Sequence, residues 1–403
     1  MTTGRPQILR SFRALASPAI LAAAILAAGC GGSSSSSSSE STGASATRSA
    51  AAEEVLWPLF GRDAERTRAI RQAPSPPYHY LWEFFARQLV EFSPVLDGDS
   101  LYVLNKSGGL YAVDIETGKP RWNSKLSADV TGPALADGAV YVTELDGNVS
   151  ALDTTDGGLR WRQRDSSGIQ SSPLVVGGRV IYGTDSGEVV ARSDSSGKQL
   201  WRAQLDAPVK ASPSLHGGVV YVGDYRGTMY ALDESSGEVR WKLDTGSGGF
   251  YSSPAIAFGR VYEARDDGTV VAARLDGKLD WSLDTKAPIY GSPSITDVDG
   301  LGETLYIGNY AGKLLALDAT SGKQHWSYDV GGQIPGSPVI VGDAVFTSSF
   351  DTKKTTGLDL ETGKKVFTWG SAGYDPVVSD GEKAFLTGFQ TVWAFDAKSA
   401  SGK

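Results

Sequence analysis

One loop of the sequence places oxygen-bearing side chains at a spacing that suits a hard cation. Asp297, Asp299 and Glu303 lie within seven residues of one another, and two glycines between them let the backbone fold tightly. Ca²⁺ takes about six to eight oxygen ligands, and Leu301, where a third carboxylate would help, offers none from its side chain. The pattern therefore predicts either a calcium site or a solvated hairpin loop.

A second set of residues with binding chemistry lies three positions before a recurring proline. Strand alternation places the residues one and three before each proline on the same side, so these positions line an axis if the strands surround one. In four consecutive units this position is polar or aromatic, and nearby turns add further side chains. The candidate binding residues are Gln170, Lys210, Tyr251, Tyr290, Asp224, Tyr225, Asn309 and Tyr310. Ordinary packing of a narrow channel explains the same residues.

The single cysteine predicts a different chemistry, lipidation. Residues 1–29 begin with arginines, continue with an apolar run and end in small residues, as a secretory signal does. Cys30 follows directly and resembles the modified cysteine of a bacterial lipobox, although Ala27 stands where leucine is commonest. An ordinary secretory signal with an incidental cysteine is the alternative. Residues 30–54, rich in Ser, Gly and Ala, are expected to form a disordered tether.

Other catalytic groups are not assembled in the sequence. The three histidines, His79, His216 and His325, have no metal-type spacing, and no Ser or Cys nucleophile is accompanied by a recognisable base. No glycine-rich phosphate loop connects a strand to a helix. The formal net charge of −8 argues against nonspecific binding of nucleic acid. We therefore expect no catalytic residues and no nucleic-acid partner.

The elements that must position the candidate site are given by a repeat. A proline, usually preceded by Ser or Gly, recurs at intervals of 38 to 45 residues, and each copy contains short β-branched and aromatic runs separated by turns. A period near 40 built from short strands is typical of a β-propeller. The repeat prolines are Pro94, Pro133, Pro173, Pro213, Pro254, Pro293, Pro338 and Pro376.

Within each unit an Asp and a large aromatic residue recur. The Asp, for example Asp233, begins a turn, and its carboxylate can accept hydrogen bonds from the backbone N–H groups of that turn. The aromatic residue follows by five to eight positions and is expected to dock against the neighbouring blade. The docking residues are Trp82, Trp122, Trp161, Trp201, Trp241, Trp281, Trp326 and Phe367.

Trp82 belongs to a strand before the first proline, whereas the eighth unit ends without its own aromatic residue. We therefore predict an all-β fold, an eight-bladed β-propeller of four-stranded antiparallel blades, in which the N-terminal strand around Trp82 closes the last blade. Residues 78–397 form this propeller and residues 398–403 a C-terminal tail. Residues 55–77 form an arm over the ring or a partner-binding segment, with one or two helical turns expected within Arg62–Gln72.

The repeat Ala-x-Asp-x-x-Thr/Ser-Gly-x-x-x-Trp resembles the pyrroloquinoline-quinone (PQQ) type propeller repeat, over about residues 82–396. That family includes quinone enzymes as well as scaffolds without a cofactor. Its dehydrogenases typically hold PQQ on the propeller axis against a disulfide between adjacent cysteines, with a Ca²⁺ beside it. Because Cys30 is the only cysteine, no such disulfide can form, and we expect no PQQ. A PQQ-dependent oxidoreductase is the alternative.

The combination of lipid anchor, tether and eight repeats is also similar to the BamB family of propeller lipoproteins of the outer-membrane β-barrel assembly machinery. This resemblance implies a non-enzymatic, monomeric scaffold that docks to an envelope protein through surface loops. We expect a protein outside the cytoplasm, held by lipid on Cys30 to a bacterial cell or outer membrane. Binding of a small molecule or glycan at the channel mouth is a further alternative.

Overall fold

The structure is a computed structural model that describes residues 57–397. These residues form 33 strands and no helix. The predicted signal segment, Cys30, the whole tether, the first two residues of the arm and the C-terminal tail lie outside the described residues. Within the described range no helix is long and apolar enough to cross a membrane.

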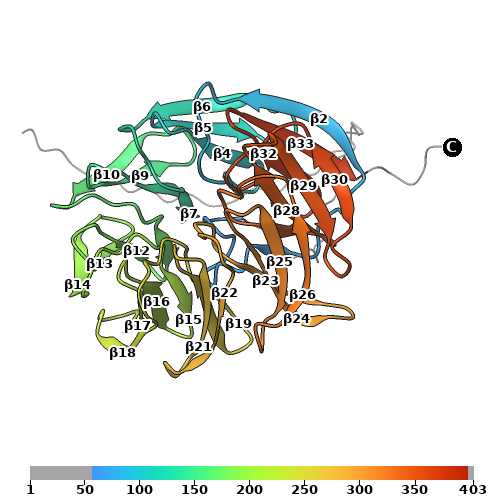
Figure 1. Cartoon of the computed structure of the whole chain (residues 1–403). Helices are drawn as coiled ribbons and strands as arrows, with labels where there is room; N and C mark the ends of the chain where they lie inside the picture. The colour runs from blue at the N-terminus through green and yellow to red at the C-terminus, as the bar shows by residue number, and fades with distance from the viewer. Residues whose placement is uncertain (1–56, 398–403) are drawn as a thin grey trace, which may run out of the picture. The chain divides into compact units, whose positions relative to one another are not determined.

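The strands are arranged in eight antiparallel sheets around a common centre, as the repeat predicts (Figure 1). The strands of the first four blades are, in order, β3 (Val95–Asp97), β4 (Ser100–Leu104), β5 (Gly109–Asp114) and β6 (Pro120–Lys125); β7 (Ala134–Ala136), β8 (Ala139–Thr143), β9 (Asn148–Asp153) and β10 (Leu159–Arg164); β11 (Leu174–Val176), β12 (Arg179–Gly183), β13 (Glu188–Ser193) and β14 (Gln199–Gln204); and β15 (Ser214–His216), β16 (Val219–Gly223), β17 (Thr228–Asp233) and β18 (Val239–Asp244).

The remaining blades continue the same order, except that the last one takes its outer strand from the N-terminal part of the chain. Their strands are β19 (Ala255–Ala257), β20 (Arg260–Ala264), β21 (Thr269–Arg274) and β22 (Leu279–Asp284); β23 (Ser294–Val298), β24 (Gly302–Gly308), β25 (Lys313–Asp318) and β26 (Gln324–Asp329); β27 (Val339–Val341), β28 (Ala344–Ser349), β29 (Lys354–Asp359) and β30 (Lys365–Trp369); and β31 (Val377–Ser379), β32 (Lys383–Thr387), β33 (Thr391–Ala397) and β2 (Tyr78–Phe85).

Closure of the ring by the strand around Trp82 is confirmed. Strand β2 pairs antiparallel with β33, with Trp82 opposite Ala394, and the two lie side by side in Figure 1. An antiparallel edge left open would expose unpaired N–H and C=O groups, and this pairing covers the edge of β33. The first strand of the propeller therefore completes the last blade.

The docking tryptophans make the same contact at seven of the eight blade junctions, and at the eighth Phe367 packs edge to face against Phe395. The Trp82 indole N–H donates to the Ile115 carbonyl oxygen at 3.0 Å, and its ring lies against Gly118. A Cβ atom at position 118 would come within 2.7 Å of that ring, and the residue has a φ of +69°. Glycine is therefore favoured here both because it has no Cβ and because it adopts a positive φ without strain. The same indole-to-carbonyl bond is made by Trp122, Trp161, Trp201, Trp241, Trp281 and Trp326.

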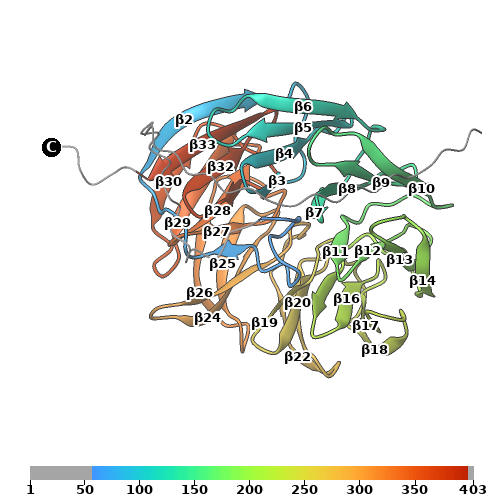
Figure 2. The ribbon, with the colours of Figure 1, turned by 180° about the vertical axis from the view of Figure 1, so that it is seen from behind.

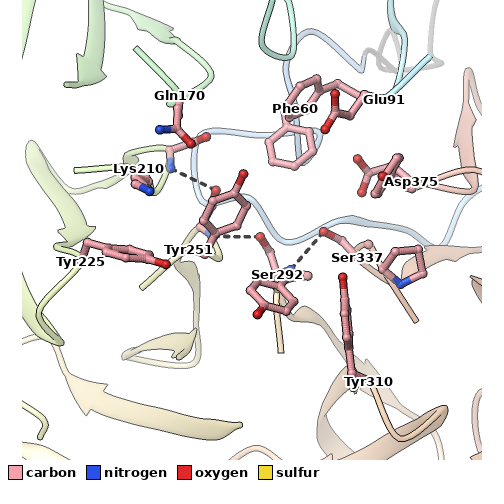
Figure 3. Close-up of a pocket in the computed structure, with 18 residues that line it drawn as sticks. Phe60, Glu91, Gln170, Lys210, Tyr225, Tyr251, Ser292, Tyr310, Ser337 and Asp375 are labelled. Carbon is pink, nitrogen blue, oxygen red and sulfur yellow. Dashed lines mark hydrogen bonds between the residues drawn. The ribbon is translucent and has the colours of Figure 1, made fainter. Parts of the chain in front are cut away.

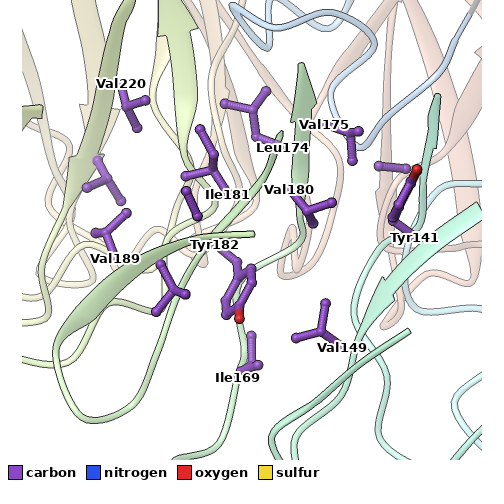
Figure 4. Close-up of a cluster of buried hydrophobic side chains, with 14 of the residues drawn as sticks. Tyr141, Val149, Ile169, Leu174, Val175, Val180, Ile181, Tyr182, Val189 and Val220 are labelled. Atoms are coloured by element: carbon purple, nitrogen blue, oxygen red, sulfur yellow. The ribbon is translucent and has the colours of Figure 1, made fainter. Parts of the chain in front are cut away.

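Apolar side chains of adjacent blades interdigitate to form the core. Figure 4 shows the part between the second and fourth blades, where Tyr141 and Val149, Ile181 and Tyr182, and Val220 face one another. These side chains are buried, because each inner sheet face is covered by the next blade. The core is therefore a series of interfaces between blades that together fix the ring.

The repeated Asp residues hold their turns, as expected. The Asp233 carboxylate accepts the N–H groups of Ser235 and Ser236, both at 3.0 Å, and also bonds Arg240 at 2.6 Å. The same pattern recurs at Asp114, where the carboxylate accepts the Thr117 N–H at 2.8 Å. These carboxylates satisfy backbone donors that the turn would otherwise leave unpaired.

The segment before β2 crosses the middle of the ring (Figure 2). Its carbonyl groups accept the N–H group that lies two residues after the repeat proline in six blades, and β1 (Ala69–Ile70) pairs parallel with β27. The donors are Leu96, Leu135, Leu215, Ile256, Ile295 and Ile340. The Arg66 side chain makes contacts of a different kind: its guanidinium donates to the Pro213 carbonyl oxygen of the fourth blade at 2.8 Å and to the Ser172 carbonyl oxygen of the third blade at 3.4 Å.

The expected helical turn within Arg62–Gln72 is wrong. Arg62, Arg66 and Arg68 have positive φ angles of 81°, 53° and 52°, which no α-helix contains. The backbone carbonyls that a helix would use internally accept the N–H groups of the inner strands instead. The segment is thus shaped by its contacts with the ring and not by local helix propensity.

Candidate functional site

A cavity of about 380 Å³ lies at one mouth of the central channel (Figure 3). Its lining combines aromatic rings, hydroxyl groups and a few charged side chains contributed by seven of the eight blades and the N-terminal segment. The residues that define it are Phe60, Glu91, Phe92, Gln170, Lys210, Tyr225, Tyr251, Tyr290, Tyr310, Tyr374 and Asp375, with the repeat serines between them.

A ring of serine hydroxyls surrounds the channel at the level of the repeat prolines. In each case the backbone N–H of one blade donates to the Ser Oγ of the next, so neighbouring inner strands are fixed edge to edge. The bonds run from Gly132 to Ser172 (2.9 Å), Ser172 to Ser212 (2.9 Å), Ser212 to Ser253 (3.2 Å), Ser253 to Ser292 (2.8 Å) and Ser292 to Ser337 (3.0 Å). Serine before the proline in most units was the sequence signal for this ring.

Asp375 takes the place of serine in the eighth blade and closes the ring. Its carboxylate accepts the backbone N–H groups of Ser337 and Ser93, which belong to the blades on either side. The side chain is fully buried, and burial raises its pKa from 3.8 to about 6, while attraction to Arg68 and the hydrogen bonds oppose that rise. The site therefore holds a carboxylate that is more readily protonated than usual.

The floor of the cavity comes from the N-terminal segment. The Phe60 ring meets Phe92 edge to face, with centroids 5.7 Å apart, and the Arg68 guanidinium lies 4.7 Å from the Phe60 centroid on the buried side. Burial lowers the pKa of Arg68 to about 10 and that of Arg66 well below its usual value. Two buried cations thus lie behind an aromatic floor.

The wall of the cavity in the fourth to sixth blades is aromatic. Tyr290 contacts Tyr251 and Tyr310 edge to face, with centroids 6.0 and 4.7 Å apart. Lys210 places its Nζ 4.2 Å from the centre of the Tyr225 ring, a cation–π contact. Figure 3 shows Lys210 and Tyr225 on one side of the cavity and Glu91 and Asp375 on the other.

The structure brings together six of the eight residues predicted for the channel mouth, namely Gln170, Lys210, Tyr225, Tyr251, Tyr290 and Tyr310. Placing Asp224 and Asn309 among them is wrong. Asp224 is buried and accepts the N–H groups of Arg226 and Thr228 at 2.9 and 3.0 Å. Asn309 does the same for its own turn, so both side chains are committed to the backbone. Binding of a ligand by the other six stays a prediction.

The loop predicted as a calcium site forms a regular hairpin. Asp297 pairs with Glu303 across β23 and β24, and Glu303 lies 3.8 Å from the Arg260 guanidinium. Among residues 57–397 no group of three or more His, Cys, Asp or Glu side chains is arranged to hold a metal ion. Asp297, Asp299 and Glu303 therefore match the alternative of a solvated hairpin better than a calcium site.

Three aromatic contributions to the cavity were missed from the sequence: Phe60, Tyr374, and Phe92, which lies two residues before its repeat proline. Phe60 belongs to a segment whose path across the ring has no repeat pattern to predict it. Tyr374 lies two residues before its repeat proline, and the unusual Asp375 beside it was the available signal that the eighth blade departs from the rule.

The eight four-stranded blades, the docking tryptophans and the closed channel define the PQQ-like class of β-propellers. The sequence profile of the family described as "Outer membrane protein assembly factor BamB" matches residues 79–213 and 194–401, so the chain belongs to this family. A comparison with curated protein sequences gives no match.

Several solved structures share the fold. BamB from Moraxella catarrhalis is 17% identical, with a TM-score of 0.66 over 79% of this chain and 99% of that one. A europium-containing methanol dehydrogenase is 14% identical, with a TM-score of 0.73 over 86% and 98%. The quinohemoprotein alcohol dehydrogenase of Comamonas testosteroni is 16% identical, with a TM-score of 0.72 over 87% and 82%. At these identities the likeness concerns the fold alone.

Proposed function

We propose that this protein is a non-enzymatic scaffold of the bacterial cell envelope, held to a membrane by lipid on Cys30, that acts in the assembly of envelope or outer-membrane proteins. The observation that carries the proposal is the match of the BamB family profile, which extends over almost the whole propeller, from residue 79 to residue 401. The predicted signal segment and tether before the propeller agree with an anchored protein of this kind.

Exposed apolar side chains around the channel mouth supply a docking surface for a protein partner. Leu145 is 43% exposed and Phe389 is 52% exposed, and both lie in turns next to the mouth. Phe389 contacts Phe350, which in turn packs against Tyr374 of the cavity wall. Exposed aromatic and aliphatic groups at a rim are the residues that interfaces preferentially bury.

The chemistry of the cavity argues against the quinone enzymes that share the fold. PQQ carries three carboxylates, whereas the lining of the cavity combines the cation Lys210 with two carboxylates, Glu91 and the buried Asp375. Phe60 and the two buried arginines behind it occupy the channel axis below the mouth. The residues present do not fit the cofactor, and we assign no redox step to them.

Site-specific photocrosslinking in intact cells tests the proposal. A photoreactive residue at Leu145 or Phe389 should crosslink to an integral envelope protein, whereas one at Leu279, equally exposed on the outer strand β22, should not. Cys30→Ser should move the protein from the membrane to the soluble fraction and abolish the crosslink.

Two results would contradict the scaffold role. One is crosslinking that is equally strong from Leu279, which would mean that the mouth is not the docking face. The other is a dye-linked dehydrogenase activity that depends on added PQQ and Ca²⁺, which would make the protein an oxidoreductase.

A further inference from the structure

The tyrosines of the channel mouth use their hydroxyl groups differently from the tyrosines inside the blades. The Tyr262 hydroxyl donates to the Ala319 carbonyl oxygen at 3.1 Å, and the Tyr306 hydroxyl donates to the Leu360 carbonyl oxygen at 2.9 Å. At the mouth, four tyrosine hydroxyls have no hydrogen-bond partner among the described residues 57–397. These residues are Tyr251, Tyr290, Tyr310 and Tyr374.

The rings of these tyrosines are nonetheless well held. Tyr290 packs edge to face against Tyr251 and Tyr310, and Tyr374 packs edge to face against Phe350 at 4.8 Å. Burial raises the pKa of Tyr251, Tyr310 and Tyr374, so their hydroxyls are protonated at neutral pH. Each can donate one hydrogen bond and accept others. The mouth thus presents several fixed hydroxyl groups that the protein itself does not satisfy.

The charged groups of the cavity are divided between its two sides. Lys210 has no carboxylate within ion-pair distance among the described residues, and its Nζ rests on the Tyr225 ring. On the opposite side lie Glu91, which pairs with Lys106 at 3.0 Å, and Asp375 (Figure 3). A ligand that spans the cavity therefore meets the Lys210 cation at one end and the Glu91 carboxylate, paired with Lys106, at the other.

We propose that the channel mouth binds an acidic saccharide, with its carboxylate at Lys210 and its hydroxyl groups at the phenols and Glu91. The apolar C–H face of a sugar ring can rest on the tyrosine rings, while its hydroxyls exchange hydrogen bonds with the phenols. The Glu91 carboxylate on the far side can accept a hydrogen bond from a sugar hydroxyl group. This proposal goes beyond the scaffold role and does not depend on it.

The dimensions and charge of the cavity narrow the ligand further. A volume of about 380 Å³ is at the lower end for small-molecule sites, enough for one or two sugar rings. Lys210 is a half-buried cation without a carboxylate partner among residues 57–397, and its one charge matches one carboxylate better than a phosphate carrying a charge of about −2. A purely apolar ligand would leave all four phenols unpaired, which costs binding free energy.

The test measures binding of galacturonate, which carries one carboxylate, to the purified full-length protein by isothermal titration and saturation-transfer NMR, with neutral galactose as the matched sugar. Galacturonate should bind saturably and more tightly than galactose. Lys210→Met should weaken galacturonate binding by roughly tenfold or more, because a charge-assisted hydrogen bond is lost. Tyr290→Phe and Tyr310→Phe, which keep the rings, should weaken binding of both sugars.

Matched controls separate the site from general effects on the protein. Lys278→Met and Tyr80→Phe remove an exposed lysine and an exposed tyrosine hydroxyl far from the mouth, and both should bind like the wild type. Thermal unfolding of each variant checks that the propeller is intact. The proposal is overturned by absence of saturable galacturonate binding, by equal binding of the two sugars, or by a folded Lys210→Met variant with unchanged affinity. None of these results bears on crosslinking to a protein partner.

Discussion

Substituting Asp375 by Asn should change how the stability of the propeller depends on pH. Burial raises the pKa of Asp375 from 3.8 to about 6. Below about pH 4 the carboxyl group is neutral in both the folded and the unfolded protein. Between pH 4 and pH 6 the unfolded protein loses the proton first, so the folded state is progressively destabilised as the pH rises. Above about pH 6 the carboxyl group is ionised in both states, and the folded state is destabilised no further by this group.

The size of the effect follows from the shift in pKa. Roughly two pKa units at about 1.36 kcal/mol each give about 3 kcal/mol of stability that the wild type has at pH 4 and lacks at pH 7.5. Asn cannot ionise, yet its side-chain oxygen can still accept the N–H groups of Ser337 and Ser93. Relative to the wild type, Asp375→Asn should therefore gain about 3 kcal/mol in free energy of unfolding over this pH range.

Urea unfolding followed by tryptophan fluorescence from pH 4 to pH 7.5 measures this difference. Comparing the variant with the wild type cancels every other group that titrates in both. Glu382→Gln, which removes an exposed carboxylate, controls for the change in net charge. Parallel stability curves for Asp375→Asn and the wild type would refute the reasoning, because they would show that Asp375 does not titrate differently in the folded state.

Three further predictions concern the core and the ring closure. Glu263 is fully buried, and its side-chain oxygens lack well-formed hydrogen bonds to the described residues. Burial, and after it the nearby charge of Asp224, raises the pKa of Glu263 well above 4.5. Glu263→Leu should therefore raise the midpoint of urea unfolding at pH 8, by an amount that shrinks as the pH is lowered. Trp82→Ala should lower the free energy of unfolding by about 3 to 5 kcal/mol, whereas Tyr80→Ala on the exposed face of the same strand should change it by less than about 1 kcal/mol. Gly118→Ala should also destabilise the protein by more than about 1 kcal/mol, since the new Cβ would overlap the Trp82 ring at a positive φ; a wild-type unfolding curve for this variant would contradict the docking geometry.

Features that repeat could be predicted from the sequence, because each copy tests the same physical rule. The proline spacing gave the blades, and the missing aromatic residue of the eighth unit, together with the extra strand around Trp82, gave the closure. Strand alternation also placed Lys210 and Tyr251 on the side that faces the channel. These inferences depend on the spacing of the repeats, which can be read directly from the amino-acid sequence.

Features that occur once could not be predicted in this way. The segment from Trp57 to Ile70 follows the inner strands through backbone hydrogen bonds, which leave no side-chain pattern. Asp224 and Asn309 have the polar character of binding residues, but the side chain of each accepts backbone N–H groups of its own turn. Phe60 reaches the cavity only because the segment that carries it crosses the channel.

The use of early residues to complete the ring has a consequence for biogenesis. Strand β2 emerges from the ribosome long before its partner β33, and the segment ahead of it must wait for inner strands from most of the later blades. Contacts so distant along the chain form slowly, and an unpaired strand edge is exposed meanwhile. The ring can close only after β33 has been synthesised, so the nascent chain needs protection from aggregation until that strand appears.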